Sequence, residues 1–207
     1  MPLFFRDNPI DFPNIIAYYS FNDNANNLAQ DNYHGTLIDN PIHISGKYGK
    51  CYEFSPLEGS HISTTLHSDL ITNNLTYAFW VYPKIITGAI FSVASDSGTG
   101  VPAILCWRLN DTTIRWNLAA DTRISTPLST NTWTHLALTY DGTTWKTYKN
   151  GIFDGQYVGN WAGRSGNLFI GKGFPSSMDG SIDEFVVTSN AYSEELISSL
   201  MTVSNPL

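Results

Sequence analysis

The chain has 207 residues and a formal net charge of -7; 14% of its residues are charged and another 14% are aromatic. This length allows one sizeable hydrophobic core, so a single domain is expected. The acidic balance argues against nucleic-acid binding, which needs clustered Lys and Arg, and no apolar run is long enough for membrane insertion.

The first segment, residues 1–13, has no regular period and is rich in Phe and Pro. We predict that it forms an N-terminal arm or a strap over the domain, and that residues 14–207 form the domain itself. The chain begins with Met, and no basic start followed by an apolar stretch is present, so no signal peptide is seen in it.

The next segments alternate in the manner of β-strands. Ile15–Phe21 is rich in aromatic and β-branched residues and breaks into the polar, turn-forming run Asn22–Asn27. Lys50–Phe54 alternates with a period of two, and Ile62–Leu66 continues this pattern. These features predict strands that are joined by turns.

A nearly continuous apolar stretch, Thr76–Tyr82, predicts a strand that is buried on both faces and central to its sheet. Pro83 is expected to end it, because proline has no N–H for the sheet. Trp80 and Trp133 are expected in the core, since strand aromatics in a sandwich usually fill the space between the sheets.

Hairpins are predicted farther along the chain. Ile104–Leu109 and Ile114–Leu118 flank a polar turn, and we expect Trp107 and Trp116 to pair across them. Strong turn signals at Asp141-Gly142 and Asn150-Gly151 join three further segments into a meander. The segments on either side of the first of these turns are Trp133–Tyr140 and Thr144–Lys149.

The C-terminal part predicts two last strands, Leu168–Gly171 and Ser181–Val187, and one short helix, Ser193–Met201. Ser193 suits the N-cap position, and two acidic residues follow in the first turn. Many short strands with one helical turn predict an all-β fold, a two-sheet antiparallel sandwich or jelly roll.

Six of these segments, in this order, resemble the laminin-G-like jelly rolls of the concanavalin A-like lectin and glucanase superfamily, and the resemblance spans almost the whole chain. The resemblance implies two curved antiparallel sheets packed face to face. Family members include sugar-binding lectins, adhesive modules and hydrolases, so the function has to be argued from the site. The matching segments are Ala17–Asn22, Gly46–Phe54, Ala78–Pro83, Trp133–Gly142, Tyr148–Gly151 and Gly180–Glu184.

The closing strand carries two adjacent carboxylates, Asp183 and Glu184. Neighbouring strand residues point to opposite faces, so we expect this pair not to act together as a retaining glycosidase pair, and we expect Glu184 at the surface or rim. The Glu-x-Asp-x-Glu pattern of the family's laminarinase-type enzymes is absent, as are nucleophile-elbow, phosphate-loop and zinc-helix motifs. A non-catalytic protein is therefore predicted, and a glycoside hydrolase is the less favoured reading.

The resemblance also implies a structural Ca²⁺ between the closing strand and the early Asn/Asp loop. Mapped onto this chain, its ligands would be Asp183 with Asn22 or Asp23, joined by Asp31. Carboxylate and amide oxygens suit this hard cation. The sequence departs from the family pattern, with Asn at position 22 where Asp is usual, and the alternative is that these side chains cap turns.

Sugar binding needs an exposed aromatic ring beside polar groups that fix the orientation of the sugar. Trp145, Trp161, Tyr157 and Arg164 lie in turn-rich stretches and are the predicted ligand-binding residues.

The predicted function is that of a lectin-like module that binds a glycan or a surface protein. Its predicted location is extracellular or on a virion surface, as part of a phage head decoration, fibre or tail. The alternative is a purely structural capsid or tail subunit, whose N-terminal arm contacts other virion subunits without binding sugar.

Overall fold

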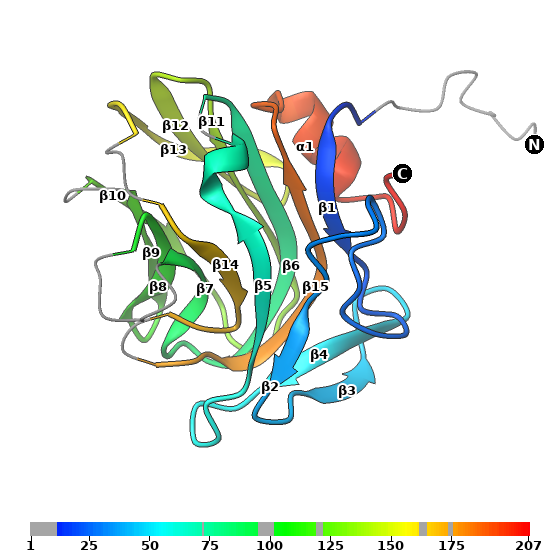
Figure 1. Cartoon of the computed structure of the whole chain (residues 1–207). Coiled ribbons are helices and arrows are strands. Elements are labelled where there is room, and N and C mark those ends of the chain that lie inside the picture. The colour runs from blue at the N-terminus through cyan, green and yellow to red at the C-terminus, as the bar shows by residue number, and fades with distance from the viewer. Residues whose placement is uncertain (1–11, 72, 95–101, 119–121, 162–164, 174–175) are drawn as a thin grey trace, which may run out of the picture.

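The computed structural model describes residues 12–71, 73–94, 102–118, 122–161, 165–173 and 176–207. In this part of the chain, fifteen strands form two antiparallel sheets, and one short α-helix follows the last strand. Figure 1 shows the helix outside the sandwich, near the first strand. The predicted all-β jelly-roll sandwich with a C-terminal helical turn is confirmed.

Eight strands form sheet A, in the order β13-β12-β11-β6-β15-β4-β3, with β1 paired to β15. Their bounds are β1 (Ile15–Tyr19), β3 (Ile42–Ser45), β4 (Lys50–Phe54), β6 (Leu75–Ile85), β11 (Thr134–Tyr140), β12 (Thr144–Lys149), β13 (Ile152–Val158) and β15 (Asp179–Thr188).

The other seven described strands form sheet B, in the order β10-β9-β8-β7-β14-β5-β2. A 3₁₀ turn, Ser68–Ile71, follows β5. The bounds are β2 (Thr36–Ile38), β5 (His61–His67), β7 (Ala89–Ala94), β8 (Ile104–Asn110), β9 (Thr113–Leu118), β10 (Thr122–Pro127) and β14 (Asn167–Ile170).

Large aromatic side chains fill the space between the sheets. Phe79 of β6 stacks on Phe185 of β15 with ring centroids 5.1 Å apart, and Phe91 of β7 meets both rings edge-on. All three are fully buried, as is Trp116 of β9. Burial of such a side chain stabilises the fold by about 1.5–3 kcal/mol relative to exposure.

The predicted central strand is confirmed, but its predicted end is wrong. β6 lies between β11 and β15 and is buried along most of its length, yet it continues through Pro83 to Ile85. Pro83 is opposite Gly180 of β15, and its carbonyl accepts a hydrogen bond from Asn131 N at 2.7 Å. Pro83 therefore pairs with β15 although it has no N–H to donate.

A second apolar layer covers the outer face of sheet A. The helix α1 (Glu194–Leu200) packs Ile197 and Leu200 there, and Ser193 caps it by accepting from Leu196 N. Figure 1 shows α1 beside β1 and β15. Among the described residues, no helix is long and apolar enough to cross a membrane.

This outer layer also fixes the end of the N-terminal segment. The Phe12 ring packs against Tyr192, and the Tyr192 hydroxyl donates to the Pro13 carbonyl at 2.9 Å. Residues 1–11 of the predicted arm or strap lie outside the described residues.

Trp80 is buried, but not between the sheets as expected. It lies on the outer face of sheet A, where Lys47 Nζ is 4.2 Å from its ring centroid and the His135 ring is 5.4 Å away. Its neighbours Phe79 and Val81 point into the main core, so strand alternation turns Trp80 outward. Trp133 is half-buried against Tyr82.

Candidate functional site

The predicted glycan platform at Trp145 is not accessible. Trp145 lies inside β12 and is 1% exposed. Its ring stacks on Tyr140 at 4.2 Å and on Trp161 at 5.6 Å between centroids. The expectation of an exposed ring at Trp145 is therefore wrong, because β12 begins directly after the turn and its second residue already faces the core.

The other predicted sugar-binding residues have different surroundings. Trp161 is half-buried, and its backbone N–H donates to the Tyr140 hydroxyl at 2.9 Å. Tyr157 is 41% exposed and lies opposite Trp145 on β13, a strand that we did not expect. Arg164 lies outside the described residues. A role for Trp161, Tyr157 and Arg164 in binding stays a prediction.

The two carboxylates of β15 do not point to opposite faces, so that expectation is wrong. Ile182 and Phe185 both belong to the core between the sheets, and the two residues that separate them both face outward. The pairing register with β6 shifts between Asp183 and Val186, and Glu184 has a left-handed backbone (φ 51). A bulge of this kind adds one residue and breaks the alternation.

Both carboxylates are buried, which also corrects the expected surface position of Glu184. Asp183 is fully buried and Glu184 is 6% exposed. Burial raises the pKa of Asp183 to about 7 and that of Glu184 to about 8. Glu184 Oε2 is 2.5 Å from the Tyr18 hydroxyl, which is itself 2.7 Å from the Ser204 carbonyl.

Asp183 and Asn22 meet at the turn between β3 and β4, as the family's loop arrangement implies, and both accept hydrogen bonds from its backbone. Asp183 Oδ2 accepts from Tyr48 N at 3.0 Å, and Asn22 Oδ1 accepts from Lys50 N at 2.9 Å. Asp183 Oδ1 accepts from Glu184 N at 2.9 Å. These oxygens tie the turn to β15 and to the loop after β1.

The predicted calcium ligands do not converge on one point. Asp23 is exposed, and Asp31 is exposed and within 3.4 Å of His34. The described residues contain no group of three or more His, Cys, Asp or Glu side chains that could hold a metal ion. The oxygens of Asp183 and Asn22 already accept N–H groups, so this set fits Ca²⁺ poorly.

A different constellation lies on the outer face of sheet B, on the hairpin β8–β9. Trp107 is directly opposite Arg115, and Asn117 follows two residues later on the same face. The alternate residues Cys106 and Trp116 point into the core. We call Trp107, Arg115 and Asn117 the outer patch; each of these side chains is half-buried.

Each member of the outer patch has a buried polar atom without a hydrogen-bond partner among the described residues. These atoms are Trp107 Nε1, Arg115 Nε and Asn117 Oδ1. Directly opposed strand residues have Cβ atoms about 5 Å apart, and residues two apart along a strand are about 7 Å apart. Two donors and one acceptor therefore occupy neighbouring positions on one face of the hairpin. Such atoms in a native structure call for an explanation.

The segment after β14 borders the outer patch. Gly173 lies so close to this face that a Cβ there would be 2.4 Å from Leu105 Cδ1 and 2.5 Å from Ala89 Cβ. Ala89 and Leu105 are the direct cross-strand neighbours of Trp107 and Asn117. Only a residue without a side chain fits at this position. The segment after β14 therefore lies close to the outer patch.

A cation and an aromatic ring extend the same face beyond this border. Lys172 Nζ is 3.4 Å from His61 Nε2, and His61 Nδ1 is 2.8 Å from the Gly59 carbonyl. A carbonyl only accepts, so Nδ1 carries the proton and Nε2 accepts from Lys172. Phe169 of β14 is half-buried beside His61, with ring centroids 6.3 Å apart.

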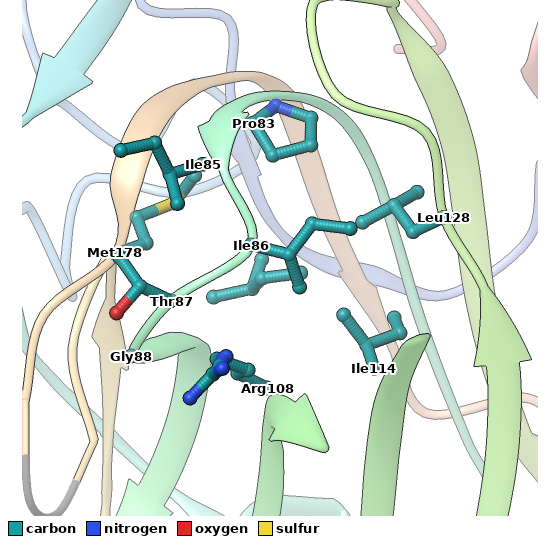
Figure 2. A pocket seen from close by; sticks show the side chains of 10 residues that line it. Pro83, Ile85, Ile86, Thr87, Gly88, Arg108, Ile114, Leu128 and Met178 are labelled. Carbon is teal, nitrogen blue, oxygen red and sulfur yellow. The ribbon is translucent and has the colours of Figure 1, made fainter. Parts of the chain in front are cut away.

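The described residues also line a small, partly open pocket. It lies where β6 leads into β7, and Figure 2 shows Ile86, Ile114 and Leu128 converging on it, with Arg108 to one side. Its volume is ≈ 10 Å³, enough for one water molecule at most. A saccharide does not fit there.

An open depression of ≈ 390 Å³ lies over β11–β13 beside α1, and Asp141, Phe153 and Glu194 are among the residues that line it. The two acidic side chains among them already accept hydrogen bonds. Asp141 accepts from Thr143 and Thr144, and Glu194 accepts from Phe153 N at 3.1 Å. The outer patch, by contrast, has open hydrogen-bonding capacity.

The sequence contained a signal for the outer patch. Ile114–Leu118 alternates strictly, which puts Arg115 and Asn117 on the face opposite Ile114, Trp116 and Leu118. The expected cross-strand pair of Trp107 with Trp116 is wrong, because the register places Trp116 opposite Cys106. The hairpin turn was predicted, but a register shifted by one residue reverses the face of every side chain.

The two-sheet architecture with its outward-facing polar and aromatic patch defines a lectin-like jelly-roll domain. A family model described as "Concanavalin A-like lectin/glucanases superfamily" matches residues 58–198. The chain belongs to this superfamily, which confirms the resemblance found in the sequence.

Solved structures of the same fold include domain 4 of AbnA, a GH43 extracellular arabinanase from Geobacillus stearothermophilus, in complex with arabinotriose. Its TM-score is 0.75 at 21% identity, and the match covers 91% of this chain and 98% of that one. The binding domain of Paraclostridial Mosquitocidal Protein 1 gives a TM-score of 0.71 at 13% identity, and the match covers 91% of this chain and 52% of that one.

The botulinum neurotoxin serotype G binding domain gives a TM-score of 0.69 at 16% identity, and the match covers 91% of this chain and 50% of that one. This chain thus spans about half the length of the toxin binding domains that it matches. At these identities the likeness shows the fold alone. A search of curated proteins by sequence finds no match.

Proposed function

We propose that this chain is a non-catalytic, lectin-like binding module that binds a glycan through the outer patch. The observation that carries the proposal is a set of three buried polar atoms that have no partner in the described part of the chain, Trp107 Nε1, Arg115 Nε and Asn117 Oδ1. A buried polar atom that lacks a partner costs about 1–3 kcal/mol. A bound sugar recovers this cost, because its hydroxyl groups donate and accept hydrogen bonds.

The arrangement of the outer patch suits a sugar ring. The half-buried indole of Trp107 offers an apolar surface, and the polar atoms of Arg115 and Asn117 lie on one side of it. Ligand sites generally combine an aromatic surface with a few polar groups that fix orientation. Small rotations of these partly exposed side chains bring the buried atoms to a ligand.

Similar solved structures are compatible with this function. The arabinanase domain was solved with arabinotriose, and the toxin domains are called binding domains. For this chain, a glycan ligand is our proposal, and a surface protein is the second kind of partner that the fold family offers.

The proposed absence of catalysis rests on the surroundings of Asp183 and Glu184. The bulge brings both carboxylates to one face, so their adjacency does not separate them. However, both are buried, Asp183 holds backbone N–H groups, and Glu184 is bonded to Tyr18. A glycosidase pair has to flank the scissile bond, which a covered pair does not do.

The predicted virion or extracellular location stays a prediction. The competing function is a structural capsid or tail subunit that binds protein and no sugar, through residues 1–13 among others. Glycan binding separates the two proposals.

The test is a glycan array followed by calorimetry with the full chain. We expect Trp107→Ala to weaken binding roughly 30-fold, as the loss of about 2 kcal/mol at an aromatic hot spot does. The matched control is Trp133→Ala, because Trp133 is also half-buried but lies against Tyr82 of sheet A. Unchanged unfolding temperatures show that the variants fold.

Two outcomes contradict the proposal. Loss of binding in Trp161→Ala but not in Trp107→Ala would move the site to the cluster around Tyr140. A flat array for the unmodified chain, together with assembly into particles that needs residues 1–13, would favour the structural subunit.

A further inference from the structure

Trp107 and Arg115 are two hydrogen-bond donors side by side with no acceptor of their own between them. Trp107 Nε1 and Arg115 Nε are both buried and have no partner within the described ranges, and the two residues are directly opposed on β8 and β9. Neither indole nor guanidinium accepts a hydrogen bond. A ligand group that meets both has to be an acceptor, and one with two lone-pair-bearing oxygens meets both best.

The charge of Arg115 is not compensated within the described part of the chain. The ion pairs found there join Lys84 to Glu53 and Arg108 to Asp111, or involve His34 and His67, and none includes Arg115. Lys172 adds a second cation to the same face, held by a histidine instead of an acid. Both cations face the same side of sheet B, on a chain whose net charge is -7, and Arg115 is the one that lies at the donor pair.

The acceptor of the outer patch lies apart from the donors. Asn117 Oδ1 is on the same strand as Arg115, about 7 Å along it, and also lacks a partner. An anionic group at the donor pair therefore leaves Asn117 to accept from a hydroxyl elsewhere on the same molecule. A sugar ring with both an acidic substituent and free hydroxyl groups meets both conditions.

We propose that the outer patch selects an acidic saccharide, one that carries a carboxylate or a sulfate ester. This inference rests on the proposed function and names its ligand class. The anionic group accepts from Arg115 Nε–H, from a second guanidinium N–H and from Trp107 Nε1–H, and a ring hydroxyl donates to Asn117 Oδ1. Arg binds planar carboxylates through two parallel hydrogen bonds, which Lys does not reproduce.

The test compares uronic-acid oligosaccharides with their neutral methyl esters, which have the same rings but no charge, and with sulfated oligosaccharides. Calorimetry with the full chain is expected to show at least 10-fold tighter binding of the acid than of the ester. This preference is expected to fall as NaCl is raised from 50 to 500 mM, because salt screens partly exposed charges. The affinity for the sulfated oligosaccharides shows whether the carboxylate or the sulfate ester is preferred.

Arg115→Gln is expected to abolish the preference for acid over ester, because it weakens binding of the acid far more than binding of the ester, whereas Trp107→Ala weakens binding of both to a similar extent. The matched control is Arg108→Gln, since Arg108 is exposed and already paired with Asp111. Arg115→Lys keeps the charge and is expected to recover only part of the preference, which separates the guanidinium fork from charge alone.

Equal affinity for acid and ester, or a preference that Arg115→Gln does not change, would overturn the inference and leave the proposed function intact. If no saccharide of any kind binds the folded chain, the proposed function itself fails.

Discussion

Glu184 carries its proton because of the atoms around it. The Tyr18 hydroxyl has one proton and lies 2.5 Å from Glu184 Oε2 and 2.7 Å from the Ser204 carbonyl. The carbonyl only accepts, so both contacts are hydrogen bonds only if Glu184 donates to Tyr18. Burial raises the pKa of Glu184 to about 8, and the nearby Asp183 adds to this rise, whereas a hydrogen bond donated by Tyr18 opposes it.

This proton makes stability depend on pH. The pKa of Glu184 is raised from 4.5 to about 8 in the folded chain, so the folded state binds a proton that the unfolded state releases. The resulting stabilisation is complete below pH 4.5 and is lost as the pH rises through 8. His135 has the opposite sign, because burial lowers its pKa from 6.5 to about 3 and favours folding above pH 6.5.

Glu184→Gln is expected to remove the Glu184 contribution to this slope. The amide N–H₂ of Gln still donates to Tyr18 but does not ionise, so the variant gains unfolding temperature relative to the unmodified chain as the pH rises from 4.5 to 9. Thermal unfolding across this range measures it. Glu58→Gln, at an exposed carboxylate, is the control. A constant difference between variant and unmodified chain at every pH would refute the assigned proton.

At the scale of elements, the β3–β4 turn is fitted to the side chains that tie it. Gly49 has φ 57, and a Cβ there would be 1.9 Å from Asn22 Oδ1. Gly46 is similarly tight, with a Cβ position 2.5 Å from Asp183 Oδ2. The turn can approach the first loop and β15 only because both positions lack a side chain.

Gly49→Ala is therefore expected to cost more than backbone strain alone. A left-handed backbone costs a residue other than Gly about 1–2 kcal/mol, and displacement of Asn22 adds about 1 kcal/mol for its hydrogen bond to Lys50. The control is Gly59→Ala, because Gly59 also has a positive φ (71) but its nearest atom is 3.7 Å away. Urea unfolding measures both. Equal losses would show that the Asn22 contact contributes nothing.

The strands were predictable where alternation and turn chemistry agree, as in β4, β5, β9, β11 and β12. The bulge in β15 was not, because Glu184 adopts a left-handed backbone without the Gly that would mark it in the sequence. The outward position of Trp80 was missed for another reason. Trp80 is covered on the outer face by Lys47 and Tyr48 of the β3–β4 turn, a long-range contact that the alternation of β6 alone does not reveal.

Of the candidate site, the sequence predicted the meeting of Asp183 with the Asn22 loop but not the outer patch. Trp145 looked accessible because turn residues flank it, whereas its burial depends on the long-range stack with Tyr140 and Trp161. Arg115 and Asn117 sat in a segment recognised as a strand. Their importance depends on which cross-strand neighbours lack partners, and a single sequence does not carry that information.

For the molecule as a whole, the resemblance and the contacts give different expectations for calcium. A structural Ca²⁺ at Asp183 and Asn22 would bind only the folded state and stabilise it, by about 2.7 kcal/mol at a concentration of 100 times its Kd. The observed hydrogen bonds of Asp183 and Asn22 join the same loops without an ion. Calcium coordination or the observed hydrogen bonds would each hold these loops together, but only calcium coordination would respond to a chelator.

We expect the unfolding temperature of the full chain to be the same in EDTA and in millimolar CaCl₂. The reason is that Asp183 and Asn22 hold backbone N–H groups, and a cation at the same oxygens would have to displace these donors. Differential scanning calorimetry at pH 6 and pH 8 makes the comparison, and the two pH values matter because the pKa of Asp183 is about 7. A fall in EDTA that is larger at pH 8 and absent in Asp183→Asn would instead establish a calcium site, since the ion needs the ionised carboxylate.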